Sequence, residues 1–136
     1  MIEKCEKHFK TGKIAYTVFA AFIVLLSVAV PILIIVIGAR LKISVIAELV
    51  LVDIGAVIAC CCYKKSAYYV ELENDKVKLY TDDGIVEKDV SDCKRIIKTA
   101  SEFFMFFNDG IIRLCNFRKC REATACIKKE NFPNVK

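Results

Sequence analysis

Two acidic residues interrupt an otherwise apolar stretch near the middle of this chain. Glu48 and Asp53 lie within residues 43–63, and Asp53 is the eleventh residue of that stretch. A carboxyl group among apolar side chains needs a hydrogen-bond partner, and it is also a group that can pass a proton through such surroundings. The two acids are therefore candidates for helix pairing or for proton transfer.

The preceding apolar run, residues 14–39, offers Asp53 a partner. Pro31 has no amide hydrogen, so it leaves the carbonyl of Ser27 without its helical donor. Antiparallel pairing of the two runs brings Asp53 to a depth between Ser27 and Pro31. A protonated Asp53 would donate to the freed carbonyl or exchange a hydrogen bond with the Ser27 hydroxyl. The predicted intramembrane polar residues are Ser27, Pro31, Glu48 and Asp53.

An assembly role for Asp53 is favoured over a proton or ion pathway. Ser44, Gly55 and Ala59 provide small side chains on the second run, and small residues allow two helices to approach closely. Two helices with one central acid are too few to enclose a pore. Transport would therefore require an oligomer.

Histidine and cysteine chemistry finds little support. His8 is the only histidine, which removes histidine triads and most catalytic zinc sites. The adjacent cysteines at 60–62 point in different directions on a helix; they are a candidate for S-acylation in a eukaryotic cell, but apolar residues ending a span are favoured. Cys115, Cys120 and Cys126 lack the close spacing of zinc ligands. We predict no catalytic, cofactor-binding or metal-binding residue and no enzyme activity.

The elements that carry these residues are two predicted transmembrane helices. Residues 14–39 hold 26 positions without a charge, residues 40–42 form a short loop, and residues 43–63 hold 21 positions. A bilayer core of about 30 Å needs about 20 helical residues. The first run is too long for a signal peptide, and a second run follows at once. A membrane hairpin is expected.

Basic residues set the expected orientation of this hairpin. Residues 1–13 hold four lysines, the loop holds two basic residues, and four lysines follow the second run by residue 78. Positive residues stay on the cytoplasmic side, so both termini are predicted to be cytoplasmic. Residues 1–13 are expected to form a basic tail, either solvated or as a helical extension at the headgroups. In that reducing compartment the eight cysteines are expected to act as small apolar fillers.

Residues 66–136 predict a small, antiparallel β domain in the cytoplasm. Short alternating runs between turn residues indicate strands at 68–73, 77–81, 85–90, 93–99, 102–107 and 111–115. Asn116 is positioned to cap a C-terminal helix, because Phe117, Cys120, Thr124 and Ile127 recur at helical steps. A partly open barrel or curled sheet plugged by that helix is expected.

The aromatic run from Phe103 to Phe107 must divide between two faces, because strand side chains alternate. Phe103, Met105 and Phe107 are expected on one face, with Phe104 and Phe106 on the other. One set fills the core. For the other set, packing beneath the C-terminal helix is favoured and dimerisation is the second possibility.

The pattern resembles the YcxB-like proteins of bacteria. The shared features are two N-terminal spans, a strand and polar turn at 70–77, Gly-Ile-Val-Glu from Gly84, the stretch from Val90 to Thr99 and the aromatic strand at 103–107. The resemblance implies a bacterial inner-membrane protein with a PH-like C-terminal domain in the cytoplasm. It brings no catalytic residues, and residues 116–119 depart from the family at the start of the helix.

Charge is unevenly divided within the β domain. Residues 71–92 carry a net charge of −5 and residues 93–136 a net charge of +6. A tethered basic surface is attracted to an anionic leaflet by about 1 kcal/mol per basic residue. The predicted lipid or partner contacts are Lys94, Arg95, Lys98, Arg113, Arg118, Lys119, Arg121, Lys128 and Lys129. Nucleic acid is not an expected partner, because no RNA-binding aromatic motif accompanies these residues.

These features together predict a membrane-anchored binding or regulatory module at the cytoplasmic leaflet. Its basic half or an exposed strand edge would engage lipid headgroups or a protein partner, without a cofactor. The alternative is an oligomeric membrane component or transporter accessory subunit with Asp53 at the helix contacts.

Overall fold

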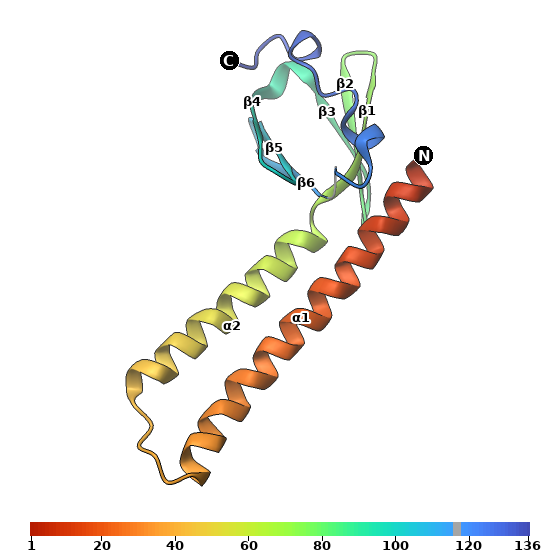
Figure 1. Cartoon of the computed structure of the whole chain (residues 1–136). Helices are drawn as coiled ribbons and strands as arrows, with labels where there is room; N and C mark the ends of the chain where they lie inside the picture. Colours follow the sequence, from red (N-terminus) through yellow and green to blue (C-terminus); the bar gives the residue numbers. More distant parts are fainter. Residues whose placement is uncertain (116–117) are drawn as a thin grey trace. The chain divides into compact units, whose positions relative to one another are not determined.

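The computed structural model describes residues 1–115 and 118–136 (Figure 1). Residues 12–63 form one compact unit, here called the hairpin unit, and residues 1–11 together with 64–136 form a second, the strand unit. The hairpin unit carries most of helix α1 (Ile2–Val36) and of helix α2 (Ile43–Lys64). The strands of the second unit are β1 (Ala67–Glu73), β2 (Lys76–Thr81), β3 (Gly84–Asp89), β4 (Cys93–Lys98), β5 (Phe103–Phe107) and β6 (Gly110–Leu114).

Both helices are long and apolar enough to cross a membrane, and their most apolar stretches are not buried within the structure. Leu25 and Leu51, for example, are each 68% exposed. Side chains of this kind, exposed along a whole helix, are typical of lipid-facing surfaces. The prediction of two membrane-spanning helices agrees with these elements.

Helix α1 ends at Val36, three residues before the predicted end of the apolar run. Gly38 has a φ of 74°, its amide donates to the carbonyl of Ile35, and the amide of Ala39 donates to that of Ile34. This pair of bonds is a Schellman motif, which needs a left-handed residue directly after the helix, and glycine adopts that conformation most easily. The apolar pattern predicts the end of the helix three residues too late, because Ile37, Gly38 and Ala39 are uncharged and continue the pattern beyond this motif.

Two contacts near the open end of the hairpin fix how α1 and α2 pair. The rings of Tyr16 and Tyr63 stack with their centroids 4.6 Å apart. The Thr17 hydroxyl lies 3.7 Å from the Sγ of Cys60. The helices are therefore aligned antiparallel.

The six strands form one mixed sheet with the order β3-β2-β1-β6-β5-β4. Consecutive strands within each half, β1 to β3 and β4 to β6, pair antiparallel. The halves join through β1 and β6, which run parallel and pair at Ala67 and Leu114. The six strands were therefore predicted correctly, but the all-antiparallel sheet was wrong. Alternation and turn residues specify each hairpin locally and carry no information on how two separate meanders meet.

A short connection curls this sheet. Strands β3 and β4 lie at opposite edges, yet only the three residues of a 3₁₀ turn, Val90–Asp92, join them. The edges must therefore approach each other, and Figure 1 shows the two halves facing one another. Lys88 of β3 reaches Asp109 in the β5–β6 turn at 2.6 Å, and Asn108 donates to Asp92 at 3.0 Å. The result is a curled sheet, one of the two expected arrangements, without the expected helix.

The Lys88–Asp109 ion pair makes this closure sensitive to acid. The hydrogen bond from Lys88 lowers the pKa of Asp109 below its ordinary value of 3.8. A lowered pKa stabilises the fold at higher pH, and that contribution is lost as the pH falls below 4 through the folded value. In a Lys88→Met variant the pKa of Asp109, measured by carboxyl carbon NMR, is expected to return to about 3.8. An unchanged titration would show that the pair does not form.

The buried residues of the strand unit come from the sheet and from both ends of the chain. Phe103, Met105 and Phe107 are buried, which confirms the predicted alternation of the aromatic strand. Phe132 packs against them from the C-terminal segment. Cys5 and Phe9, on the first turns of α1, are buried as well, and Phe9 lies against Tyr68 of β1 with centroids 5.4 Å apart.

Residues 1–11 are thus a helical extension that belongs to the strand unit. A solvated tail was the wrong alternative.

The predicted C-terminal helix is also wrong. Its start at Asn116 and Phe117 lies outside the described residues, and the remaining segment holds only two 3₁₀ turns, Arg121–Thr124 and Lys129–Asn131. Side-chain amides replace helical hydrogen bonds here, because Asn131 donates to the carbonyl of Cys126 and Asn134 to that of Ser91, each at 2.8 Å. Such local bonds compete with helix formation.

Candidate anion-binding groove

Four of the predicted contact residues meet in one groove of about 620 Å³. Its remaining lining combines two hydroxyls with small and apolar side chains. The basic residues are Lys98, Arg118, Arg121 and Lys128, and the others are Thr99, Ala100, Phe103, Thr124, Ala125 and Ile127.

One wall of this groove is the end of the β4–β5 hairpin. The Thr99 amide donates to the Glu102 carbonyl at 2.9 Å and the Thr99 hydroxyl bonds the same residue, which closes the turn. Lys98 ends β4, and its Nζ lies 5.7 Å from the ring centroid of Phe103. A cation over an aromatic ring is attracted to the ring by about 0.5 to 1 kcal/mol at an exposed site. The turn therefore presents one oriented positive charge.

The opposite wall is the C-terminal segment. Cys120 and Ala123 are buried, so the short turn between them is held against the strands and leaves Arg121 and Thr124 at its surface. Arg118 precedes this turn and Lys128 follows it. The segment thus contributes three of the four positive charges.

This lining is suited to binding anions. None of the described residues that line the groove is acidic. Arginine offers a fork of donors that matches phosphate or carboxylate, and lysine adds a point charge. Hydroxyl groups such as Thr99 and Thr124 can donate to the same oxygens. The set can therefore bind an anionic group such as a phosphate or a carboxylate.

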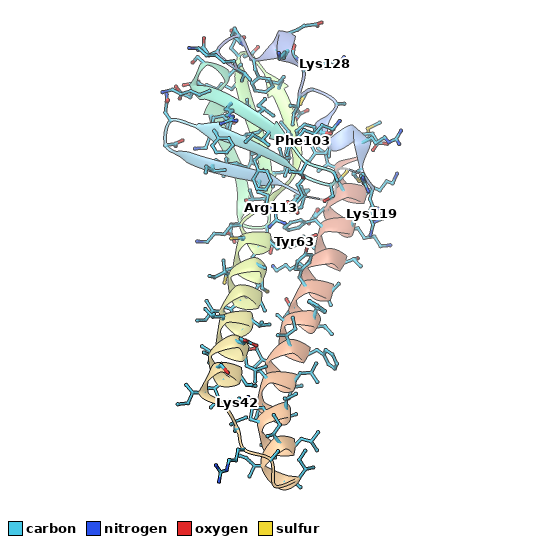
Figure 2. The ribbon with its side chains drawn as sticks, turned by 60° about the vertical axis from the view of Figure 1, so that its left-hand side comes forward. Lys42, Tyr63, Phe103, Arg113, Lys119 and Lys128 are labelled. Carbon is cyan, nitrogen blue, oxygen red and sulfur yellow. The ribbon has the colours of Figure 1, made fainter. Side chains whose placement is uncertain are left out.

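The other predicted contacts lie elsewhere. Arg113 forms an ion pair with Glu102, which neutralises it. Lys94 and Arg95 are exposed on β4, and Lys129 lies in the last 3₁₀ turn. Figure 2 shows Lys119 and Lys128 well apart on the C-terminal segment. The basic half is therefore one groove with scattered charges around it.

An acidic hollow of about 660 Å³ occupies another part of the strand unit. Its lining includes Glu73, Asp75, Asp89 and Glu130 from the β1–β2 turn, the end of β3 and the C-terminal segment. The charge polarity read from the sequence therefore corresponds to two separate surfaces. Phe103 and the two threonines of the basic groove were not predicted as site residues, because loop packing brings them there.

In the hairpin unit, Asp53 pairs with Ser27. The Ser27 Oγ lies 2.6 Å from Asp53 Oδ2 and 2.8 Å from the Val24 carbonyl oxygen. Asp53 Oδ1 is buried and has no hydrogen-bond partner among the described residues. Of the two contacts anticipated for Asp53, the structure has the one to the Ser27 hydroxyl.

The other predicted polar residues of the hairpin do not join this pair. Glu48 is exposed on α2, and Pro31 is half-buried on α1. Gly55 and Ala59 are exposed on α2, where a second helix has access to them. The polar site within the hairpin is therefore the Ser27–Asp53 pair.

Comparison of the chain with family models, curated proteins and solved structures gives no match. The fold by itself defines a class: two apolar helices long enough to cross a membrane, followed by a six-stranded mixed sheet.

Proposed function

We propose that this protein is a membrane-anchored binding module. Its two helices cross the inner membrane of a bacterial cell with both termini in the cytoplasm, and its sheet is a PH-like domain of the YcxB-like kind. The lysine distribution along the sequence supports this orientation. The curled sheet supports the PH-like assignment, whereas the missing C-terminal helix does not.

The observation that carries the proposal is the basic groove. Four positive side chains converge on one hollow without an acidic residue among its described lining. The ligand is a phosphate-bearing group, and the lipid headgroups of an anionic leaflet supply it at high local concentration. Each basic residue near such a surface contributes about 1 kcal/mol. Ligand binding by the module would therefore depend on the anionic lipid content of the membrane around its two helices.

Binding is proposed in preference to catalysis because of the chemistry of the lining. Arginine keeps its proton at physiological pH and so serves as a binding group, not as a general base. The threonine hydroxyls need an adjacent base to act as nucleophiles, and the charged residues of the described groove lining are all cationic.

A second candidate is an oligomeric membrane component. The exposed Gly55 and Ala59 favour it, because small residues on a lipid-facing surface let another helix approach. Asp53 supports it less, since its carboxyl already bonds Ser27 of the same chain.

Neutralising the groove should weaken ligand binding. In an Arg121→Gln/Lys128→Gln double variant, two charge-assisted hydrogen bonds to the ligand become neutral ones and weaken by about 1 kcal/mol each, so affinity is expected to fall about thirtyfold. The measurement is calorimetric titration of the full chain in phosphatidylcholine nanodiscs with soluble glycerophosphoglycerol. Affinity should also fall as salt rises.

A matched control is Lys94→Gln/Arg95→Gln, which removes the same charge from exposed positions of β4 outside the groove. It should change the affinity less than threefold. Equal losses in both variants would indicate a diffuse charge effect and contradict a groove. Titration with inorganic phosphate separates two kinds of site. A site for a lipid headgroup should bind phosphate alone more weakly than glycerophosphoglycerol, whereas a site for free phosphate should not.

A further inference from the structure

Two cysteines and a glutamate from opposite ends of the chain meet in the strand unit. The Sγ atoms of Cys5 and Cys120 and a carboxylate oxygen of Glu122 all lie within 4.8 Å of one another. Cys5 is on the first turns of α1, and Cys120 and Glu122 are at the start of the first C-terminal 3₁₀ turn. The sequence separates these residues so widely that no spacing motif connects them.

Packing fixes the two thiols. Cys5 is 3% exposed and Cys120 is 2% exposed. Phe9, one helical turn after Cys5, is fully buried against Tyr68, so the helix face that carries Cys5 is held to the strands. Buried Ala123 anchors the turn that carries Glu122. Glu122 itself is exposed, which opens the cluster to solvent on one side.

Burial and a neighbouring thiol keep Cys5 in its neutral form without a cation. Burial, followed by the hydrogen bond and charge of Cys120, raises the pKa of Cys5 to about 12. Cys5 lies before the uncharged stretch that begins at Ile14 and belongs to the strand unit. A bound cation would act against these effects and favour the thiolate form of Cys5.

Distances and ligand types match one small thiophilic ion. Ligand sulfurs on a tetrahedral zinc ion, each about 2.3 Å from the metal, lie about 3.8 Å apart. The cluster is within about 1 Å of that spacing. Thiolates select zinc-like cations over magnesium or calcium, and a carboxylate is an accepted third ligand.

We propose that Cys5, Cys120 and Glu122 bind one divalent cation of the zinc class. On binding, each thiol loses its proton to solvent, and each sulfur and one Glu122 oxygen donate an electron pair to the ion; nothing is oxidised or reduced. A water molecule on the solvent side completes a tetrahedron. The ion links the first turns of α1 to the C-terminal segment. Metal binding therefore stabilises the packed position of residues 1–11.

Cobalt titration of the full chain tests this site. The protein is purified in detergent with a phosphine reductant, stripped with a chelator and titrated with Co²⁺, which gives a thiolate-to-metal charge-transfer band when sulfur binds it. The expected result is saturation at about one ion per chain and displacement by Zn²⁺. Cys5→Ala and Cys120→Ala should abolish the band, and Glu122→Gln should weaken affinity at least about tenfold.

Two further variants keep the test decisive. Cys93→Ala removes an equally buried thiol outside the cluster and should leave the cobalt band intact. Cys120→His supplies a nitrogen ligand and should restore cobalt binding with a weaker sulfur band, which excludes misfolding as the cause of the loss. A band that survives in Cys5→Ala, or no cobalt binding by the wild-type chain, would overturn the site.

Discussion

Replacing Phe9 with alanine is expected to lower the free energy of unfolding of the strand unit by about 3 to 5 kcal/mol. Phe9 is fully buried, and its ring contacts Tyr68 at a centroid distance of 5.4 Å. The change removes the apolar transfer energy of a phenyl ring and leaves a cavity between α1 and β1. For a unit of this size such a loss is a large part of the total stability.

Hydrogen exchange of the strand amides measures this effect in the full chain in detergent. A loss of 3 kcal/mol should speed exchange of the core strands at least about hundredfold where exchange follows global opening. Phe19→Ala is the matched control, because Phe19 is on the same helix and is 62% exposed. Unchanged protection in Phe9→Ala would mean that residues 1–11 do not belong to the domain core.

The sequence of residues 1–13 has the composition of a solvated tail. Charged or polar side chains occupy most of its positions, and the apolar periodicity is too sparse to predict a packed helix. Only Cys5 and Phe9 are buried there. Their spacing of four residues is the single signal for a buried face, and it became meaningful only once the strands supplied a surface to cover.

Local patterns predicted the strands well because their determinants are local. The turn at Asn74 and Asp75 has both residues at positive φ, 49° and 59°, as a two-residue hairpin requires. The parallel contact of Ala67 with Leu114 joins residues far apart in sequence, and no local pattern encodes it. The prediction of a C-terminal helix failed for a related reason. The path of this segment follows the burial of Phe132 and not the helical periodicity of its sequence.

The candidate site was predictable in its charge and not in its shape. Counting bases identified the residues of the groove, but it equally selected Arg113, which an ion pair with Glu102 neutralises. The cysteine cluster illustrates the opposite case. Cys120 is close in sequence to Cys115 and Cys126, whereas its neighbour in space is Cys5.

Replacing Asp53 with leucine is expected to make insertion of the second helix more favourable by about 3 kcal/mol. An acid at the centre of a membrane helix costs about 2.5 to 3.5 kcal/mol, and leucine contributes a few tenths of a kcal/mol in the favourable direction. The second helix also carries Glu48, so the free energy of its membrane insertion in the unmodified chain is close to zero. Glycosylation mapping of inserted and uninserted chains should show a clear rise in the inserted fraction.

The same change should loosen the hairpin only slightly. It removes the 2.6 Å hydrogen bond between Ser27 and Asp53, and such bonds between membrane helices average about 0.6 kcal/mol. Disulfide formation between Cys60 and a cysteine placed at Thr17, whose side chains already touch, reports the register. Its equilibrium yield should fall no more than about threefold, because the Tyr16–Tyr63 stack remains.

Asp53→Asn and Ser27→Ala separate the two effects of the carboxyl. The asparagine variant keeps a hydrogen-bonding group opposite Ser27 and should keep the crosslink, whereas Ser27→Ala leaves the acid buried without this partner and should lower insertion of the helix pair. If Asp53→Leu instead reduced insertion, the carboxyl would stabilise the second helix in the membrane by more than its burial costs. If Asp53 destabilises the inserted helix and Ser27 partly compensates, Asp53→Leu should raise the inserted fraction and Ser27→Ala should lower it.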